Sequence, residues 1–338
     1  MHRRNFLTAA CAVASTSALG VTRRAPAAES KSKAVLRVAT LAPKGSSWMR
    51  VFDAWNNTLS ERTKGRLKLH FYAGGAAGDE RDAVRKMRAG QLDAAAVTTV
   101  GLGQIVRSSL VLQAPGVCYT YARIDAVRAK LASEFEREFD GAGFKLLGWG
   151  DAGQGRVFSN RPIVSPDDMR QTRMWAWRDD PTWQSVLDAA GVNGVSLGLP
   201  EVYPALRTDR IDAFPGTSIA AVAFQWYTKA AYVTKEPRGI VVGATVVKKE
   251  KFDALPDDLK QALSETSKTA HQALAKAIRR DDDRAFEAIV ARGVKPVSLA
   301  KNMKAWDDVL AKARKSLAGK LYPADLLKRV EEIAKKAG

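Results

Sequence analysis

The opening third of the chain alternates between strand-like and helix-like segments. Short apolar, β-branched runs are separated by amphipathic runs that end at Gly65 and Gly90. In order, the segments are a strand at 34–41, a helix at 48–63, a strand at 67–72, a helix at 79–89 and a strand at 92–97. Strands joined through helices predict a mostly parallel sheet with right-handed crossovers.

The second half repeats strand and helix signals and ends in helices. Strands are predicted at 143–148, 156–159, 173–177, 195–199 and 210–214, with helices at 181–190 and 200–207. A β-rich run at 239–247 is expected to return to the first sheet. A helix at 256–291 has no Gly or Pro in its interior, and about 30 helical residues span about 45 Å. The rest, 303–336, is expected to be helical with breaks near Gly319 and Pro323.

The first 27 residues have the features of an export signal. Arg3 and Arg4 form a twin-arginine pattern, a small-residue apolar run follows, and Ala25-Pro-Ala27 has the form of a cleavage site. A membrane anchor is the alternative, but the run is shorter than the about 20 apolar residues that a span needs. We therefore expect a twin-arginine signal at 1–27, cleavage near Ala27 and a periplasmic mature protein with one remaining cysteine, Cys118.

The charge is strongly basic, with a formal net charge of +18 over 338 residues. Such a charge fits nucleic acid, an anionic membrane surface or acidic ligands. The basic residues are, however, spread along amphipathic helices with acidic residues between them, and no nucleic-acid-binding motif is present. We expect a solvated basic surface and no nucleic-acid partner.

Motifs for catalysis, cofactors or metals find no support in the sequence. Gly148-Trp-Gly-Asp-Ala-Gly153 matches a dinucleotide fingerprint, but a strand-like segment follows it instead of the required helix. A flexible crossover between lobes suits this glycine-rich segment better. The three histidines, His2, His70 and His271, lie far apart in the chain and have no metal-ligand spacing. We expect no metal, no cofactor and no enzymatic activity.

Aromatic residues gather where a binding site is expected. Trp175 and Trp177 alternate on one predicted strand, so they face the same side. Trp149, Phe158, Phe214 and Trp226 lie at predicted strand ends or in the loops after them. Core packing accounts for most aromatics and for roughly half of these. Ligands of open α/β sheets nevertheless bind beyond the carboxyl ends of strands.

Several motifs together resemble the solute-binding proteins of TRAP (tripartite ATP-independent periplasmic) transporters. These are the 65–72 strand, the Gly90-Gln-Leu-Asp93 turn, the Arg-x-Phe-Ser strand at 156–159 with Ser-Pro-Asp-Asp-Met169, and Glu201-Val-Tyr-x-Ala-Leu206 with Asp212. Each motif is moderately specific, and their shared order makes the resemblance strong. It covers nearly the whole mature chain.

The resemblance implies a two-lobed periplasmic binding protein of the α/β class, with mostly parallel or mixed sheets and an inter-lobe cleft. We expect lobe 1 at 34–150 plus about 239–280, and lobe 2 at about 151–238 plus 281–338, with the long helix bracing both. The implied function is capture of one small molecule by lobe closure and its delivery to TRAP membrane permease subunits. Some members of a less-studied branch, which this chain resembles, work with a periplasmic helical-repeat (TPR-like) protein, a second implied partner.

The expected site departs from the family pattern. The family motif Asp-Leu-Lys-Gly-Leu-Lys-Ile-Arg ends in an arginine that clamps a ligand carboxylate, and Trp175 stands at that position here. Gly216 replaces a frequent asparagine, and Leu199 aligns with a pocket aromatic. Arg156 aligns with a second family arginine that can reach the ligand. Trp48 and Thr98 complete the expected ligand-binding set.

These changes predict an apolar or aromatic ligand with at most a single carboxylate on Arg156. An indole supplies area and one N–H donor where the family has a charged fork. Two other function classes stay open at this point. One is a ligand-sensing or scaffold protein without transport, and the other is an exported enzyme, for which the sequence lacks a catalytic grouping.

Overall fold

The computed structural model describes residues 33–338 and begins with the predicted alternation of strands and helices. The segments are β1 (Ala34–Thr40), α1 (Ser47–Arg62), β2 (Leu67–Tyr72), α2 (Glu80–Arg88) and β3 (Ala94–Thr98). β1 lies between β2 and β3 and runs parallel to both. Apolar alternation sets this arrangement, because Leu67 and Leu69 of β2 and the Trp55 face of α1 are buried together.

One long strand links the two lobes. β4 (Phe144–Ser159) is continuous where two strands separated by a flexible crossover were predicted, so that expectation was wrong. Its early residues pair with β9 (Gly239–Lys248), which pairs with β3 as expected. Its last four residues pair with β7 (Ala213–Gly216). The glycine-rich segment stays in the ladder because register shifts at Leu146/Gly148 and Asp151/Gly153 absorb its bends.

We call the sheet β2-β1-β3-β9-β4 and its helices the first lobe. The second lobe holds β7, the end of β4, β8 (Tyr232–Thr234) and β10 (Lys295–Val297), together with a parallel pair, β5 (Trp175–Trp177) and β6 (Val195–Leu197). Its helices are α5 (Pro181–Ala190), α6 (Val202–Arg207) and α7 (Ser218–Ala223). The sheets are mixed, because β9 and β4 run antiparallel to their neighbours.

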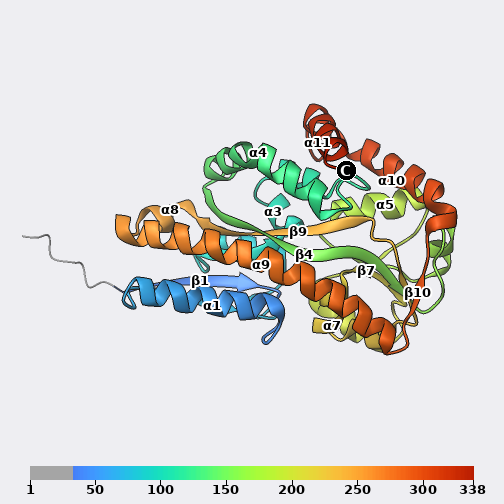
Figure 1. Ribbon diagram of the computed structural model, residues 1–338, viewed down its shortest axis with the longest axis horizontal. Helices are drawn as coiled ribbons and strands as arrows, with labels where there is room; N and C mark the ends of the chain where they lie inside the picture. Colours follow the sequence, from blue (N-terminus) through green and yellow to red (C-terminus); the bar gives the residue numbers. More distant parts are fainter. Residues whose placement is uncertain (1–32) are drawn as a thin grey trace, which may run out of the picture. The chain divides into compact units, whose positions relative to one another are not determined.

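The predicted brace is α9 (Asp257–Ala291), a helix of 35 residues and about 52 Å. Figure 1 shows it in orange, running past strands of both lobes. It packs on α1, α7 and β4. Residues Leu259, Leu263, Leu274 and Ile278 of this helix are buried in one core cluster.

Helix α4 (Tyr121–Gly141) was not anticipated, although its buried residues recur at helical spacing. The chain ends in α10 (Met303–Leu317), which packs on α5, and α11 (Ala324–Lys336), which packs on α4. Since α4 covers the first-lobe strands, α11 belongs to the core of the first lobe. The expected assignment of all of 281–338 to lobe 2 is therefore wrong for this last helix. The physical reason is that its apolar face matches that of α4.

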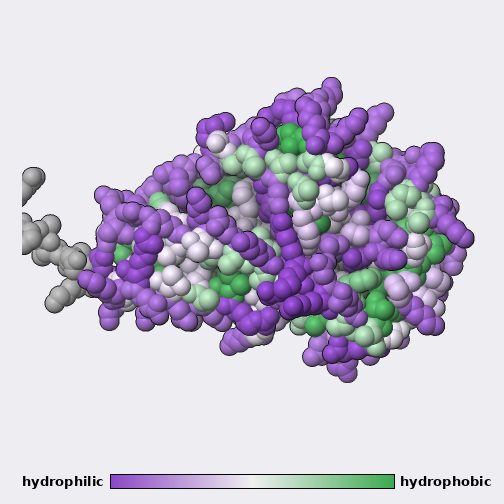
Figure 2. Space-filling model, in the orientation of Figure 1, coloured by the Kyte–Doolittle hydropathy of each residue, from purple (hydrophilic) through white to green (hydrophobic). Residues whose placement is uncertain are grey.

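Shorter elements complete the described chain. They are α3 (Thr99–Gly103), η1 (Arg107–Gln113), η2 (Pro166–Gln171), η3 (Leu199–Glu201), η4 (Trp226–Lys229), α8 (Lys249–Asp253) and η5 (Ala300–Asn302). Figure 2 shows a largely hydrophilic face with scattered apolar areas. Among residues 33–338, no helix has the length and apolar character needed to cross a bilayer. The predicted signal at 1–27 and its cleavage near Ala27 lie outside the described residues.

Candidate functional site

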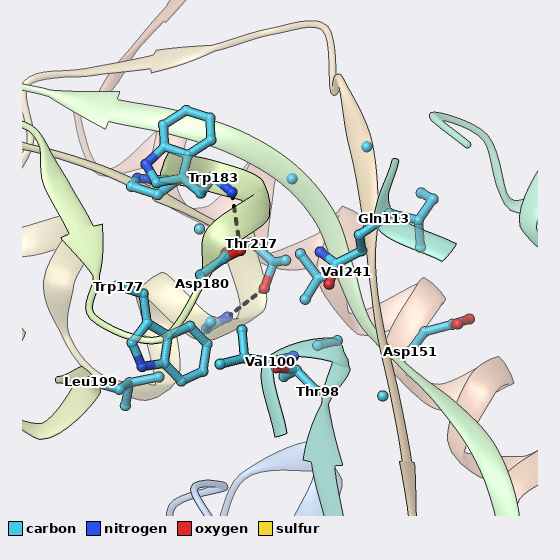
Figure 3. Close-up of a pocket in the computed structure, with 18 of the residues that line it drawn as sticks. Thr98, Val100, Gln113, Asp151, Trp177, Asp180, Trp183, Leu199, Thr217 and Val241 are labelled. Atoms are coloured by element: carbon cyan, nitrogen blue, oxygen red, sulfur yellow. Dashed lines mark hydrogen bonds between the residues drawn. The ribbon is translucent and has the colours of Figure 1, made fainter. Parts of the chain in front are cut away.

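A cavity of about 310 Å³ lies between the lobes and takes its walls from both. The first lobe supplies Thr40, Trp48, Thr98, Val100, Gln113 and Asp151. The second supplies Arg156, Trp175, Trp177, Asp180, Trp183 and Leu199. Figure 3 shows Trp177 and Leu199 on one side, with Gln113 and Val241 across from them. Its size and apolar walls suit a small organic molecule.

Thr98 reaches the cavity because β3 ends there and α3 begins. Its hydroxyl accepts a hydrogen bond from the Val100 amide (3.2 Å), which caps the helix. The buried carboxylate of Glu80 accepts hydrogen bonds from the Thr98 amide (2.7 Å), the Thr98 hydroxyl (2.8 Å) and the Gly101 amide (2.7 Å). Burial raises the pKa of Glu80 to about 7. The hydrogen bonds hold this corner of the cavity rigidly.

Tryptophans form much of the second-lobe wall. Trp175 is 3% exposed, and its ring lies 5.4 Å from that of Trp226 and 5.9 Å from that of Trp177. The indole N–H of Trp175 donates to the Leu197 carbonyl (3.1 Å), and that of Trp183 donates to the Trp175 carbonyl (3.1 Å). The N–H group of Trp177 donates to the Asp79 carboxylate (3.0 Å). These three indoles therefore offer a ligand their ring surface and no free donor.

Arg156 brings a cation to the cavity wall, and the acids that act on it, Asp282, Asp283 and Glu236, lie beyond ion-pair distance. Its guanidinium donates to the carbonyls of Thr234 (3.0 Å) and Lys235 and to the Gln154 side chain (3.2 Å), and it lies over the Phe286 ring (4.1 Å). Its Nε has no acceptor, and within residues 33–338 no carboxylate lies within ion-pair distance. Burial lowers the pKa of Arg156 from its ordinary value. A ligand carboxylate would complete this environment.

Eight of the eleven predicted site residues line the cavity. They are Trp48, Thr98, Arg156, Trp175, Trp177, Leu199, Gly216 and Trp226. Their contact with a ligand stays a prediction. Gly216 lies opposite Arg156 in the β4–β7 ladder, and a Cβ there would lie 3.7 Å from the Phe214 ring and 4.0 Å from the Trp226 ring.

Three predicted residues do not line the cavity. Trp149 packs edge-on against Phe135 (5.7 Å) and Phe139 (6.5 Å), because α4 covers its side of β4. Phe158 and Phe214 are cross-strand partners whose rings stack at 5.0 Å, fully buried behind Trp226. They form a second layer that supports the wall.

Some residues that line the cavity were not predicted from the sequence. Asp180 and Trp183 belong to the first turn of α5, which starts just after β5 ends. The signal was available, since an Asp-Pro pair at a helix start directly follows a predicted strand end. Gln113 and Val241 gave no comparable signal. Within residues 33–338, no three His, Cys, Asp or Glu side chains gather in a group that could hold a metal ion.

Comparison with known proteins places the chain in a family. Residues 38–320 match the model of the bacterial extracellular solute-binding protein, family 7. The 2,3-diketo-L-gulonate-binding periplasmic protein YiaO of Escherichia coli (strain K12) is 24% identical over 289 residues, covering 82% of this chain and 86% of that relative.

Solved structures agree on the fold. A TRAP periplasmic solute-binding protein from Ralstonia eutropha H16 with bound (S)-2-acetolactate has a TM-score of 0.82 at 21% identity, covering 89% of this chain and 99% of the other. The sugar acid binding protein DctPAm of Advenella mimigardefordensis, in complex with galactonate, has a TM-score of 0.85 at 18% identity, covering 91% and 99%. Matched along nearly its whole described length, the chain belongs to the family 7 bacterial extracellular solute-binding proteins, with the two-lobed fold of TRAP-transporter receptors.

Proposed function

We propose that the protein captures a small, largely apolar or aromatic monocarboxylate in the periplasm and delivers it to a TRAP membrane permease. Membership of a solute-binding family supports capture and transport. The observation that carries the ligand class is the composition of the cavity wall. Trp175, Trp177, Trp183 and Trp226 line the second-lobe wall, and Arg156 is the cation there that has no ion pair within the described chain.

The apolar body of the ligand follows from Trp175. A bidentate arginine at this point would favour a polar anion. The buried Trp175 indole instead donates its N–H to the Leu197 carbonyl and has no donor left for a ligand. The ligands named for the two solved relatives, acetolactate and galactonate, are organic acids, which supports a carboxylate in the ligand. Their other polar groups do not argue for an apolar body, so that part rests on this chain alone.

A binding experiment with matched probes tests the proposal. We expect 3-phenylpropanoate to raise the melting temperature by several degrees and succinate, galactonate and lactate to leave it unchanged. The variant Arg156→Gln is expected to bind 3-phenylpropanoate about tenfold more weakly, because it loses a charge-assisted pair. The neutral 3-phenylpropanamide should bind both proteins alike. Arg107→Gln, at an exposed arginine, is the control and should behave as the wild type.

A shift of several degrees with a small dicarboxylate, and none with apolar acids, would contradict the ligand class. Native mass spectrometry of the purified protein separates the remaining function classes. A co-purified acid supports a receptor, whereas turnover of an added compound would indicate an enzyme. Export by a twin-arginine signal and a helical-repeat partner stay predictions of the sequence.

A further inference from the structure

Asp180 places a carboxylate on the cavity wall among the tryptophans. It is the N-cap of α5, where one oxygen, Oδ1, accepts hydrogen bonds from the amides of Thr182 (2.9 Å) and Trp183 (3.0 Å). The other oxygen, Oδ2, accepts no hydrogen bond and has no ion-pair partner within residues 33–338. Figure 3 shows Asp180 in the region between Trp183 and Trp177. Capping therefore uses only half of this carboxylate.

The two other carboxylates of the wall have no such free oxygen. Glu80 accepts three hydrogen bonds from Thr98 and Gly101. Asp151 is held between two arginines, with Oδ1 at 2.9 Å from Arg128 and Oδ2 at 2.7 Å from Arg279. Asp151 Oδ1 accepts no hydrogen bond but belongs to an ion pair. Asp180 Oδ2 is thus the wall carboxylate oxygen that has neither a hydrogen bond nor an ion pair within residues 33–338.

Asp180 is half-buried, and a ligand that covers its second oxygen in the cavity would have to donate to it to avoid a desolvation cost. Burial raises the pKa of Asp180, and the two capping amides oppose this rise. At Arg156 the situation is the opposite, because its Nε–H donor has no acceptor. Both groups lie on the wall of one cavity, with the ring surfaces of Trp175 and Trp177 on the same wall.

We infer that Asp180 is a ligand subsite that accepts a hydrogen bond from a hydroxyl or ammonium group on the ligand. The ligand is then an amphipathic acid, with a carboxylate for Arg156, an apolar or aromatic body for the tryptophans and a donor group for Asp180. This inference rests on the proposed function and narrows its ligand class.

The variant Asp180→Asn separates a ligand subsite from a cap. Asparagine caps helices as well as aspartate does, so the Thr182 and Trp183 amides keep their acceptor. The oxygen that does not cap the helix, however, becomes an NH₂ donor. If Asp180 is purely structural, the variant keeps the ligand preference of the wild type, whereas loss of a subsite acceptor abolishes the preference for ligands that carry a donor.

Calorimetric titration with four acids provides the test. The probes are 3-phenylpropanoate and its para-hydroxy, para-aminomethyl and para-methoxy derivatives. In the wild type, we expect the hydroxy or aminomethyl probe to bind about tenfold more tightly than the unsubstituted acid, as a hydrogen bond to a charged acceptor would give. Which of the two binds more tightly identifies the donor as hydroxyl or ammonium.

Asp180→Asn should lose that preference, bind the methoxy probe at least as well as the wild type does, and melt without ligand at an unchanged temperature. Equal binding of all four probes by the wild type overturns the inference while the proposed function stands. The same preference in Asp180→Asn and the wild type also overturns it. If no probe binds the wild type, the proposed ligand class fails, and the inference fails with it.

Discussion

Among the side chains of the cavity wall, Trp175 shows how the structure changes an expectation drawn from the sequence. The family resemblance implies that Trp175 stands in place of a clamping arginine, and its indole N–H was expected as a donor to the ligand. In the structure, this N–H donates a hydrogen bond to the Leu197 carbonyl instead. Only the ring surface remains for a ligand. Trp175 therefore presents no polar group to a ligand.

His271 makes folding stability depend on pH at the residue scale. It is buried beside Trp55, with Nδ1 at 2.7 Å from the Ser267 carbonyl and Nε2 at 2.8 Å from the Thr245 hydroxyl. Burial lowers the pKa of His271 to about 4. Above pH 6.5, the ordinary pKa of histidine, His271 is neutral in both the folded and the unfolded state, and the fold has its full stability. As pH falls from 6.5 toward 4, the unfolded state binds a proton that the buried residue does not, so the free energy of unfolding decreases. The loss amounts to about 3 kcal/mol across this window.

The variant His271→Gln tests this, since it does not titrate. Urea unfolding at pH 7 and pH 5 should show a larger loss of unfolding free energy in the wild type than in the variant. Glu80, whose pKa is raised to about 7, contributes in the opposite direction, because its neutral form is favoured in the fold. That contribution is common to both proteins and cancels in the comparison. An equal pH dependence in both proteins would show that His271 is not responsible.

Among the elements, α9 is held by Asp282 to the part of β4 that links the two lobes. This buried carboxylate accepts hydrogen bonds from the Gln154 amide of β4 (2.8 Å) and the Ile219 amide of α7 (2.9 Å). The close approach requires Gly153, whose φ is +116°. A Cβ there would lie 2.7 Å from the Asp282 carboxylate and 2.8 Å from Thr217. β4, α9 and α7 therefore meet at Gly153, where there is no room for a side chain.

Gly153→Ala is therefore expected to lower the unfolding free energy by about 1–3 kcal/mol through crowding, with added backbone strain. Gly239→Ala is the matched control on the neighbouring strand, because a Cβ there meets nothing within 4 Å. It should stay within about 0.5 kcal/mol of the wild type. Chemical denaturation of the three proteins measures the difference. Similar midpoints for both variants would contradict the proposed crowding at Gly153.

For the whole molecule, Asp79 joins the two lobes directly. Its carboxylate, at the N-cap of α2 in the first lobe, accepts hydrogen bonds from the Trp177 indole (3.0 Å) and the Leu199 amide (2.9 Å) in the second. Gly198 permits the approach, since a Cβ there would lie 2.9 Å from the carboxylate. Both second-lobe partners line the cavity. The bonds therefore hold the wall in place only while the lobes are together.

Asp79→Ser keeps the helix cap, because serine caps well, but its shorter side chain cannot bridge the lobes. We expect ligand affinity to fall about tenfold, since closure loses two hydrogen bonds to a charged acceptor. Solution X-ray scattering without ligand should show a larger radius of gyration. Arg85→Gln, which breaks only the exposed pair with Asp82 within α2, is the control and should change little. Equal affinities for Asp79→Ser and the wild type would argue against the contact.

Much of the fold could be anticipated from local patterns. The first five elements, the helix at 181–190 and the long brace follow from hydrophobic periods and from Gly and Pro positions that act within a few residues. Helix α4 was missed although its period was present, and β4 was divided because glycines suggested a break. Bulges that keep a glycine-rich strand in its ladder depend on the neighbouring strand, which no local pattern describes.

Local patterns and motifs in the sequence predict the family and most of the order of the elements. Which aromatics face the cavity follows from tertiary packing. Trp149 is covered by α4, and Phe158 and Phe214 cover each other, while Trp183 faces the cavity from a helix start. The reason is physical. Whether a side chain is packed or free, and whether a polar atom such as Asp180 Oδ2 has a partner, depends on residues far away in the chain.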